Sequence, residues 1–349
     1  MAKVSDEQFS AFAGGSGGRS PAAAIWLFAV AALILAMVVV GGATRVTGSG
    51  LSITQWQPVS GIVPPMNHGA WERVFALYQA TPQYRLLNHE MSLGQFQSIF
   101  WWEWAHRLLG RLLGLVFFVP FVALLVLRRL PRRLIGRCAL LFVLGALQGV
   151  VGWWMVRSGL EDRTSVAPER LATHLGLALA LFVAVIWTAL EARRGAARSG
   201  AVSRRWRWAS GLFLAAVFIQ CLMGALVAGN HAGLVDADWP LMAGRVFPGD
   251  FWQGGLWATL VHGAAAVQFN HRIWAYGLLA AGVGLAVAGW SGRRRGLTLA
   301  IATLLLVQAT IGVAMLWLTV PLPLALLHQS IAAGLLALAT VLAWQYRRA

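Results

Sequence analysis

Residues 22–43, AAAIWLFAVAALILAMVVVGGA, form an apolar run that contains no charged side chain. A helix of about 20 apolar residues is long enough to cross the hydrocarbon core of a bilayer. Seven further, mostly apolar runs follow, at residues 107–127, 134–156, 172–192, 209–229, 272–291, 297–319 and 323–345. The sequence therefore predicts an all-α integral membrane protein with eight transmembrane helices.

The composition supports a membrane protein and excludes several functions. The 349 residues are 58% hydrophobic and 11% charged, whereas about 25% of residues are charged in soluble domains. A formal net charge of +16 would suggest nucleic-acid binding in a soluble chain, but here the basic residues stand in short clusters between apolar runs. We therefore expect no nucleic-acid partner. Cys138 and Cys221 both lie inside apolar runs, so we expect no disulfide, zinc site or iron–sulfur site.

The basic clusters also predict the orientation of the chain. Arginines gather at residues 128–137, 193–207, 293–295 and 347–348, in alternate connections between the spans, and most acidic residues lie in the other connections. Lys and Arg concentrate in cytoplasmic loops. We therefore expect a bacterial inner-membrane protein with both termini in the cytoplasm.

Two of the acidic outer loops are long, at residues 44–105 and 230–270, and both are rich in Trp, Pro and Gly. Long loops in compact proteins are usually functional. This composition favours short amphipathic helices at the membrane surface, with aromatic anchors. The chemistry is therefore expected on the periplasmic side.

The two halves of the chain repeat one pattern. Each half has a His-Arg pair at the outer end of its second span, a Gln followed four residues later by Gly in its third, and a His at the start of its fourth; these residues are His106-Arg107, Gln148/Gly152 and His174, then His271-Arg272, Gln308/Gly312 and His328. The pattern predicts two four-helix bundles in a parallel repeat. The predicted divisions are a cytoplasmic tail (1–21), a first half (22–192), an Arg-rich linker (193–208) and a second half (209–349).

The four repeated histidines are candidate metal ligands. A histidine in a membrane span needs a partner for its polar nitrogens, so four at matching positions indicate a function. Two facing histidines in a four-helix bundle are the usual way to hold a six-coordinate haem. We therefore expect His106 and His174 to hold one haem iron, and His271 and His328 to hold another. The small residues Gly110, Ala178, Ala275 and Ala332, each four positions after a histidine, would leave room for the macrocycle.

Arg107 and Arg272 follow their histidines directly and are candidates to pair with haem propionates; the alternative is an arginine in the lipid headgroup layer. The other four histidines, His68, His89, His231 and His262, lie in the outer loops and are expected to be solvated or structural.

The halves differ at one position that matters for chemistry. Glu103 stands three residues before His106, and Gln268 stands three residues before His271. A carboxylate one helical turn from an axial ligand can take a proton, orient water or stabilise positive charge, and an amide does these poorly. We therefore expect the first half to be catalytic, with Glu103 as its catalytic residue. The alternative is that Glu103 only balances the helix dipole at the start of the second span.

These residues resemble the haem A synthase family over nearly the whole chain. The most specific parts are GGATRVTGSGLS at 41–52, then Trp56, Pro58, Gly61, Pro64 and Pro65, FWWEWAHR at 100–107, and VQFNHR at 267–272. The sequence looks like the proteobacterial and mitochondrial branch, because it lacks the pair of loop cysteines of another branch.

The resemblance implies an oxidoreductase that oxidises the C8 methyl group of haem O to a formyl group by successive hydroxylations. The product, haem A, serves cytochrome c oxidase assembly. It also implies substrate haem between His106 and His174, the cofactor haem b between His271 and His328, and catalysis by Glu103. The partners implied are haem O and the farnesyltransferase that makes it, and self-association into a homo-oligomer is a further possible arrangement. The Gly-rich segment 41–65 is expected to cover the edge of the substrate haem.

Two other functions remain open from the residues alone. A b-type electron-transfer cytochrome, such as a quinol oxidoreductase, would also hold two haems but would not need Glu103. A haem transporter or chaperone would show weaker or one-sided ligation.

Overall fold

The computed structural model describes residues 18–195 and 203–348, and within them it is helical, with one isolated β-bridge and no strand. Eight helices are long and apolar enough to cross a membrane. They are α2 (Pro21–Val46), α5 (Leu93–Val126), α6 (Arg132–Glu161), α7 (Pro168–Arg194), α8 (Arg204–Gly229), α9 (Ala264–Ala288), α10 (Arg295–Trp317) and α11 (Leu322–Arg348). The prediction of an all-α protein with eight spans is confirmed. The predicted tail up to residue 17 and residues 196–202 of the predicted linker lie outside the described residues.

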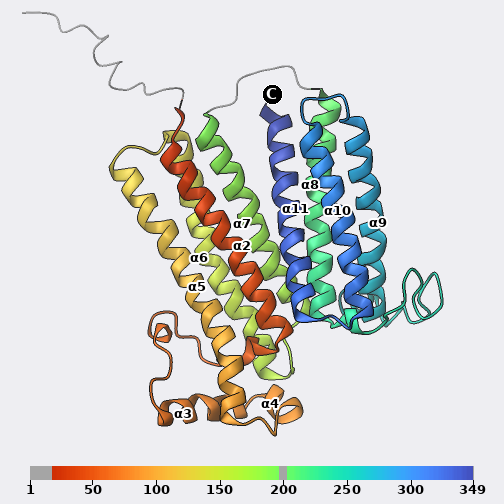
Figure 1. Ribbon diagram of the computed structural model, residues 1–349. Coiled ribbons are helices and arrows are strands. Elements are labelled where there is room, and N and C mark those ends of the chain that lie inside the picture. Colours follow the sequence, from red (N-terminus) through yellow and green to blue (C-terminus); the bar gives the residue numbers. More distant parts are fainter. Residues whose placement is uncertain (1–17, 196–202, 349) are drawn as a thin grey trace, which may run out of the picture.

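The eight helices form two groups of four (Figure 1). Helices α2, α5, α6 and α7 make one group and α8 to α11 make the other, and α2 and α7 pack against α8 and α11 where the groups meet. The buried core runs through both groups and includes Leu27, Val185 and Leu336. Gln329 of α11 reaches across this interface, donates a hydrogen bond of 2.5 Å to the carbonyl of Val38, and fills the space left by Gly42.

Helix α5 begins much earlier than the hydropathy pattern predicted, at Leu93 instead of residue 107. The helix begins with a capping box. The Ser92 hydroxyl accepts a hydrogen bond from the backbone N–H of Gln95, and the side-chain oxygen of Gln95 accepts one from the backbone N–H of Ser92. The helical turns before residue 107 contain Gln, Ser and Glu, so a search for continuous apolar residues does not include them. As a result α5 extends beyond the other membrane-spanning helices at the end opposite the termini (Figure 1).

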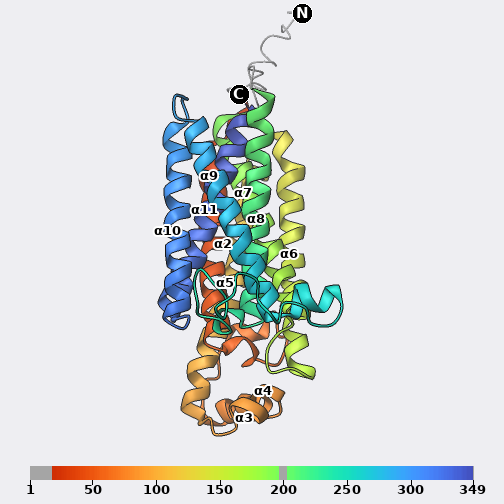
Figure 2. The same ribbon diagram turned by 90° about the vertical axis from the view of Figure 1, so that its right-hand side faces the viewer.

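Short helices α3 (His68–Gln79) and α4 (Pro82–Leu87) gather around the first turns of α5 (Figure 2). Tyr78, Phe96 and Phe100 form a small buried cluster there, separate from the main core. The Tyr78 hydroxyl donates to Gln83 and accepts from Asn88, and burial raises the pKa of Tyr78. The prediction of short helices in the first outer loop is confirmed.

The second outer loop differs from the first. Between α8 and α9 the chain makes only the 3₁₀ turn η4 (Ala232–Leu234) and the single π turn η5 (Ala258–His262). The prediction of amphipathic helices in this loop is therefore wrong. Prolines and glycines prevent regular helices from forming in this loop. Hydrogen bonds from side chains of α9 to loop carbonyls hold it in place.

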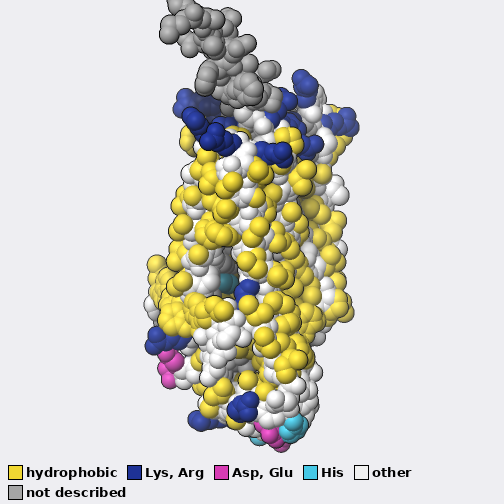
Figure 3. Space-filling model, turned by 90° about the vertical axis from the view of Figure 1, so that its left-hand side faces the viewer, with side chains coloured by type: hydrophobic (Ala, Val, Ile, Leu, Met, Phe, Trp, Pro, Cys, Tyr) yellow, Lys and Arg dark blue, Asp and Glu magenta, His cyan; other side chains and the backbone are white. Residues whose placement is uncertain are grey.

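The charges separate along the bundle. Arginine side chains crowd the end from which the chain termini emerge, and acidic side chains appear at the other end (Figure 3). Midway along this face, which lies over the first group of helices, the surface is hollowed, with a histidine and a basic side chain at its floor between apolar walls.

Candidate functional site

The four repeated histidines lie inside membrane-spanning helices. His174, His271 and His328 sit in the second turns of α7, α9 and α11, close to the predicted helix starts. The prediction that His106 opens its helix is wrong, because the early start of α5 places it well inside. His106 and His174 lie in the first group of helices and His271 and His328 in the second, so each group holds the two histidines of one predicted pair.

Each of the four imidazole rings rests on a glycine of a neighbouring helix. A Cβ atom added to Gly41, Gly152, Gly224 or Gly312 would lie 3.0, 3.0, 3.4 or 3.1 Å from Cε1 of His106, His174, His271 or His328, respectively. At Gly41, Gly152 and Gly312 this distance is tighter than ordinary van der Waals contact, so an added side chain would push the ring; at Gly224 the contact is an ordinary one. The glycines thus set how closely each ring approaches the neighbouring helix. Gly41 lies in α2, Gly152 in α6, Gly224 in α8 and Gly312 in α10.

A second contact fixes three of the four histidines. The Nε2 amide of Gln148 donates to the carbonyl of His174 at 2.8 Å, that of Gln220 to His271 at 3.1 Å, and that of Gln308 to His328 at 3.0 Å. Each glutamine precedes its ring-supporting glycine by four residues, so both face the same histidine. Two of these Gln/Gly pairs were predicted from the sequence as parts of the repeat, but their contact with a histidine was not, although the four-residue spacing indicates it.

These residues fit a haem. Nδ1 of His106 and Nδ1 of His328 are buried without a hydrogen-bond partner, so each ring has an unused polar atom. No group of three or more His, Cys, Asp or Glu side chains that would hold a bare metal ion occurs in the described residues. A histidine pair needs a ligand that brings its own equatorial nitrogens, and a porphyrin does so.

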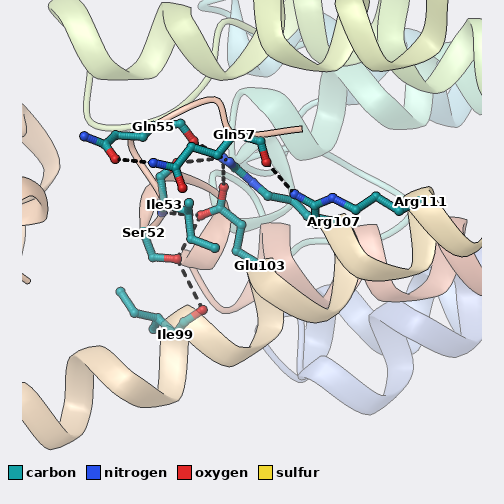
Figure 4. Close-up of polar contacts among 8 residues, drawn as sticks. All are labelled: Ser52, Ile53, Gln55, Gln57, Ile99, Glu103, Arg107 and Arg111. Atoms are coloured by element: carbon teal, nitrogen blue, oxygen red, sulfur yellow. Dashed lines mark hydrogen bonds and ion pairs between the residues drawn. The ribbon is translucent and has the colours of Figure 1, made fainter. Parts of the chain in front are cut away.

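Glu103 is buried at 3% exposure and is surrounded by hydrogen-bond donors (Figure 4). Its Oε2 accepts from the Ser52 hydroxyl at 2.8 Å and from the Ile53 amide at 2.7 Å, and its Oε1 pairs with Arg107. Because α5 begins at Leu93, Glu103 lies in the helix interior and does not balance the dipole at its start. That alternative is therefore excluded.

The same contacts fasten an outer loop onto α5. Arg107 also donates to the carbonyls of Ile53 and Gln55, and Arg111 donates to that of Gln57 (Figure 4). Arg111 donates to the carbonyl of Pro58 as well. Residues 52–58 thus lie along the helix face that carries Glu103. Arg107 is occupied by these contacts, so its pairing with a propionate stays a prediction. Segment 41–65 was predicted to cover the edge of the substrate haem. Its first residues, up to Val46, form the last turns of α2 instead of a loop.

The second half uses matching residues with reversed hydrogen-bond polarity. Gln268, at 2% exposure, donates to the carbonyl of Asp236, and Arg272 donates to the carbonyls of Asp236, Asp238 and Leu241. Glu103 accepts from its loop, whereas Gln268 donates to its own. In both halves the loop is bonded to the helix that bears the histidine. Only α5 has a carboxylate at this position; α9 has the amide of Gln268.

Two loop histidines are exposed beside acidic residues, as expected: His68 lies 3.3 Å from Glu72, and His89 lies 3.7 Å from Glu90. The other two join the halves. His231 hydrogen-bonds to Arg45 at 2.8 Å, and burial together with this guanidinium lowers the pKa of His231. Nε2 of His262 lies 3.8 Å from Glu169 of α7. Their roles are structural contacts between the bundles.

Arg107→Gln is expected to loosen residues 52–58 without unfolding the bundle. Hydrogen bonds to a charged group contribute about 1.5–3 kcal/mol, so amide exchange at Ile53 should accelerate roughly tenfold or more. Hydrogen–deuterium exchange mass spectrometry of the loop peptide measures this. Arg73→Gln, at an exposed position of α3, is the control. Unchanged exchange at Ile53 in Arg107→Gln would show that the loop is held by other contacts.

Comparison with known proteins places this chain in a family. Residues 24–340 match the family described as cytochrome oxidase assembly protein. The chain is 57% identical over 337 residues to a haem A synthase of Caulobacter vibrioides, covering 95% of this chain and 97% of that protein. It is 48% identical over 336 residues to a haem A synthase of Parvibaculum lavamentivorans, covering 94% of each chain. A haem A synthase of Brucella ovis is 45% identical over 325 residues, covering 90% of this chain and 88% of that protein.

Proposed function

The chain belongs to the cytochrome oxidase assembly protein family and catalyses the haem A synthase reaction, the conversion of haem O to haem A, and we propose that its two halves divide this work. In this proposal the halves are a parallel repeat. The first half binds and oxidises the substrate haem between His106 and His174, and the second holds haem b between His271 and His328. The observation that carries the division is the buried carboxylate of Glu103, at a place where the second half has Gln268.

The residues of the first half suit a reaction at the edge of the substrate haem. His106 and His174 hold its iron, and Gly41 and Gly152 keep the two rings at fixed depth. Glu103 lies about one turn from His106 on α5, on the side where residues 52–58 are tied to the helix. That loop forms a wall that excludes water from the reacting edge.

In this proposal Glu103 would serve as the proton acceptor and as a negative charge beside the substrate haem. When water supplies the oxygen atom, oxidation of a methyl to a formyl group (R–CH3 + H2O → R–CHO + 4 H+ + 4 e−) releases protons that a carboxylate can accept. Oε2 is the atom that receives a proton in this scheme, because its donors, the Ser52 hydroxyl and the Ile53 amide, are neutral, whereas Oε1 is paired with Arg107. When bound, haem b supplies one-electron redox chemistry to the protein.

The location of the sites supports a supply of haem O from the membrane. The eight apolar helices make this a multi-pass membrane protein. We infer an inner-membrane location with the basic end in the cytoplasm and the haem sites toward the periplasm, because arginine crowds the end that bears the termini (Figure 3). A contact with the haem O synthase and a homo-oligomer are part of this proposal.

The proposal predicts the haem content of the purified protein. Extraction and chromatography of haems from the wild type should give haem b together with haem O, haem A or the hydroxylated intermediate, in close to equal amounts. The two haem classes then report on the two halves separately. Two equivalents of haem b and no other haem would identify an electron-transfer cytochrome and overturn the division proposed here.

A further inference from the structure

One of the four histidines lacks an anchor that the other three share. The carbonyls of His174, His271 and His328 each accept a hydrogen bond from a glutamine amide of the adjacent helix, at 2.8, 3.1 and 3.0 Å. No such bond reaches His106 among the hydrogen bonds of the described residues. Three histidines are thus held by a glycine and a glutamine, and His106 by a glycine alone.

Met37 stands where a glutamine stands beside the other three histidines. The glutamines stand four residues before Gly152, Gly224 and Gly312, and the residue four before Gly41 is Met37. Its methyl Cε lies 3.7 Å from where a Cβ would stand on Gly110, one turn beyond His106, so the side chain lies beside the helix that carries the histidine. A thioether has no hydrogen to donate. Met37 stands at the position that a glutamine has in the other three cases, and it cannot donate a bond to the His106 carbonyl.

The difference falls where the two haems have opposite requirements. A substrate site must release its haem after every turnover, whereas a cofactor site must keep it. Partners that orient a metal-ligating histidine typically change metal affinity by about 10–100-fold when they are removed. Both histidines of the second half carry the glutamine bond. In the first half His174 carries it and His106 does not.

We propose that Met37 is a positioning residue that makes His106 the readily released ligand of the first-half haem. This inference rests on the proposed function. Release begins at His106, because a flexible, apolar contact lets its turn of α5 shift. His174 keeps hold of the haem until the product departs. The two glutamine-anchored histidines of the second half hold their haem throughout.

Met37→Gln tests this inference, because glutamine matches methionine in length and restores the donor. The expected result is that transfer of the first-half haem to added apomyoglobin slows by about tenfold. The fraction of ferrous protein that binds carbon monoxide, which requires a released ligand, should fall with it. Met37→Leu keeps an apolar side chain and should transfer haem at the wild-type rate. Gln220→Met makes the reverse change in the second half and should speed loss of haem b by about tenfold.

Several outcomes overturn the inference. If Met37→Gln transfers haem within twofold of the wild-type rate, the glutamine bond does not control release. If Met37→Leu slows transfer as much as Met37→Gln, side-chain shape is responsible. If Met37→Gln does not assemble, Gln220→Met remains as the test. A rate of haem b loss equal to that of the wild type in Gln220→Met would overturn the inference. Haem identity separates this failure from failure of the proposed function: wild type that carries haem O or haem A, with an unaltered release rate in Met37→Gln, refutes only the role of Met37.

Discussion

Glu103→Gln is expected to abolish most conversion of haem O to haem A while haem b stays bound. The carboxylate of Glu103 accepts hydrogen bonds from the Ser52 hydroxyl and the Ile53 amide and pairs with Arg107. A glutamine amide cannot take up a proton at this place, and its NH₂ group would face donors. A positioned acid–base group contributes about 10²–10⁴-fold to a rate, so turnover should fall by that amount. Haem chromatography should then show haem O accumulating beside unchanged haem b.

Two further variants separate chemistry from support of the loop. Ser52→Ala removes one hydrogen bond to Glu103, a bond to a charged group that contributes about 1.5–3 kcal/mol, and keeps the carboxylate, so turnover should fall by less than it does in Glu103→Gln. Gln268→Glu changes the matching residue of the second half, where it removes the hydrogen bond to the Asp236 carbonyl, and should lower turnover less than Glu103→Gln does. Equal losses in Ser52→Ala and Glu103→Gln would mean that the carboxylate only fastens residues 52–58, and the catalytic assignment would be wrong.

His328→Ala and His174→Ala are expected to remove different haems. His328 is held by Gln308 and rests on Gly312, and His174 is held by Gln148 and rests on Gly152. Loss of one axial ligand removes a coordination bond outright, so the affected haem should fall roughly tenfold or more in the purified protein. His328→Ala should lose haem b. His174→Ala should keep haem b and lose haem O and haem A.

The matched control for both is His89→Ala, since His89 is exposed in the outer loop. It should keep the wild-type content of each haem. Loss of haem b from His174→Ala together with its retention in His328→Ala would reverse the assignment of the halves. Loss of both haems from either variant, in protein that still elutes as a folded species, would mean that the two sites depend on each other.

Local sequence features predicted much of this architecture. Hydropathy is a sum over neighbouring residues, so the eight apolar runs reported eight spans directly. The failures were also local in origin. The first turns of α5 contain Gln95, Ser98 and Glu103, which hide a continuous helix from an apolar-run criterion. For this reason His106 was wrongly predicted to lie at the start of its helix. The start of α5 at Leu93 also excludes a role for Glu103 in balancing the helix dipole.

The sequence by itself determined the class of protein, the eight spans, the separation of charge between the two ends and the types of side chain available for haem ligation. These depend on residues close together along the chain. Only the tertiary structure decided what holds those side chains. Glu103 meets Ser52, 51 positions away, and Gln220 meets His271, also 51 positions away. Such contacts arise from the packing of one helix or loop against another, and no local pattern encodes which atoms face each other.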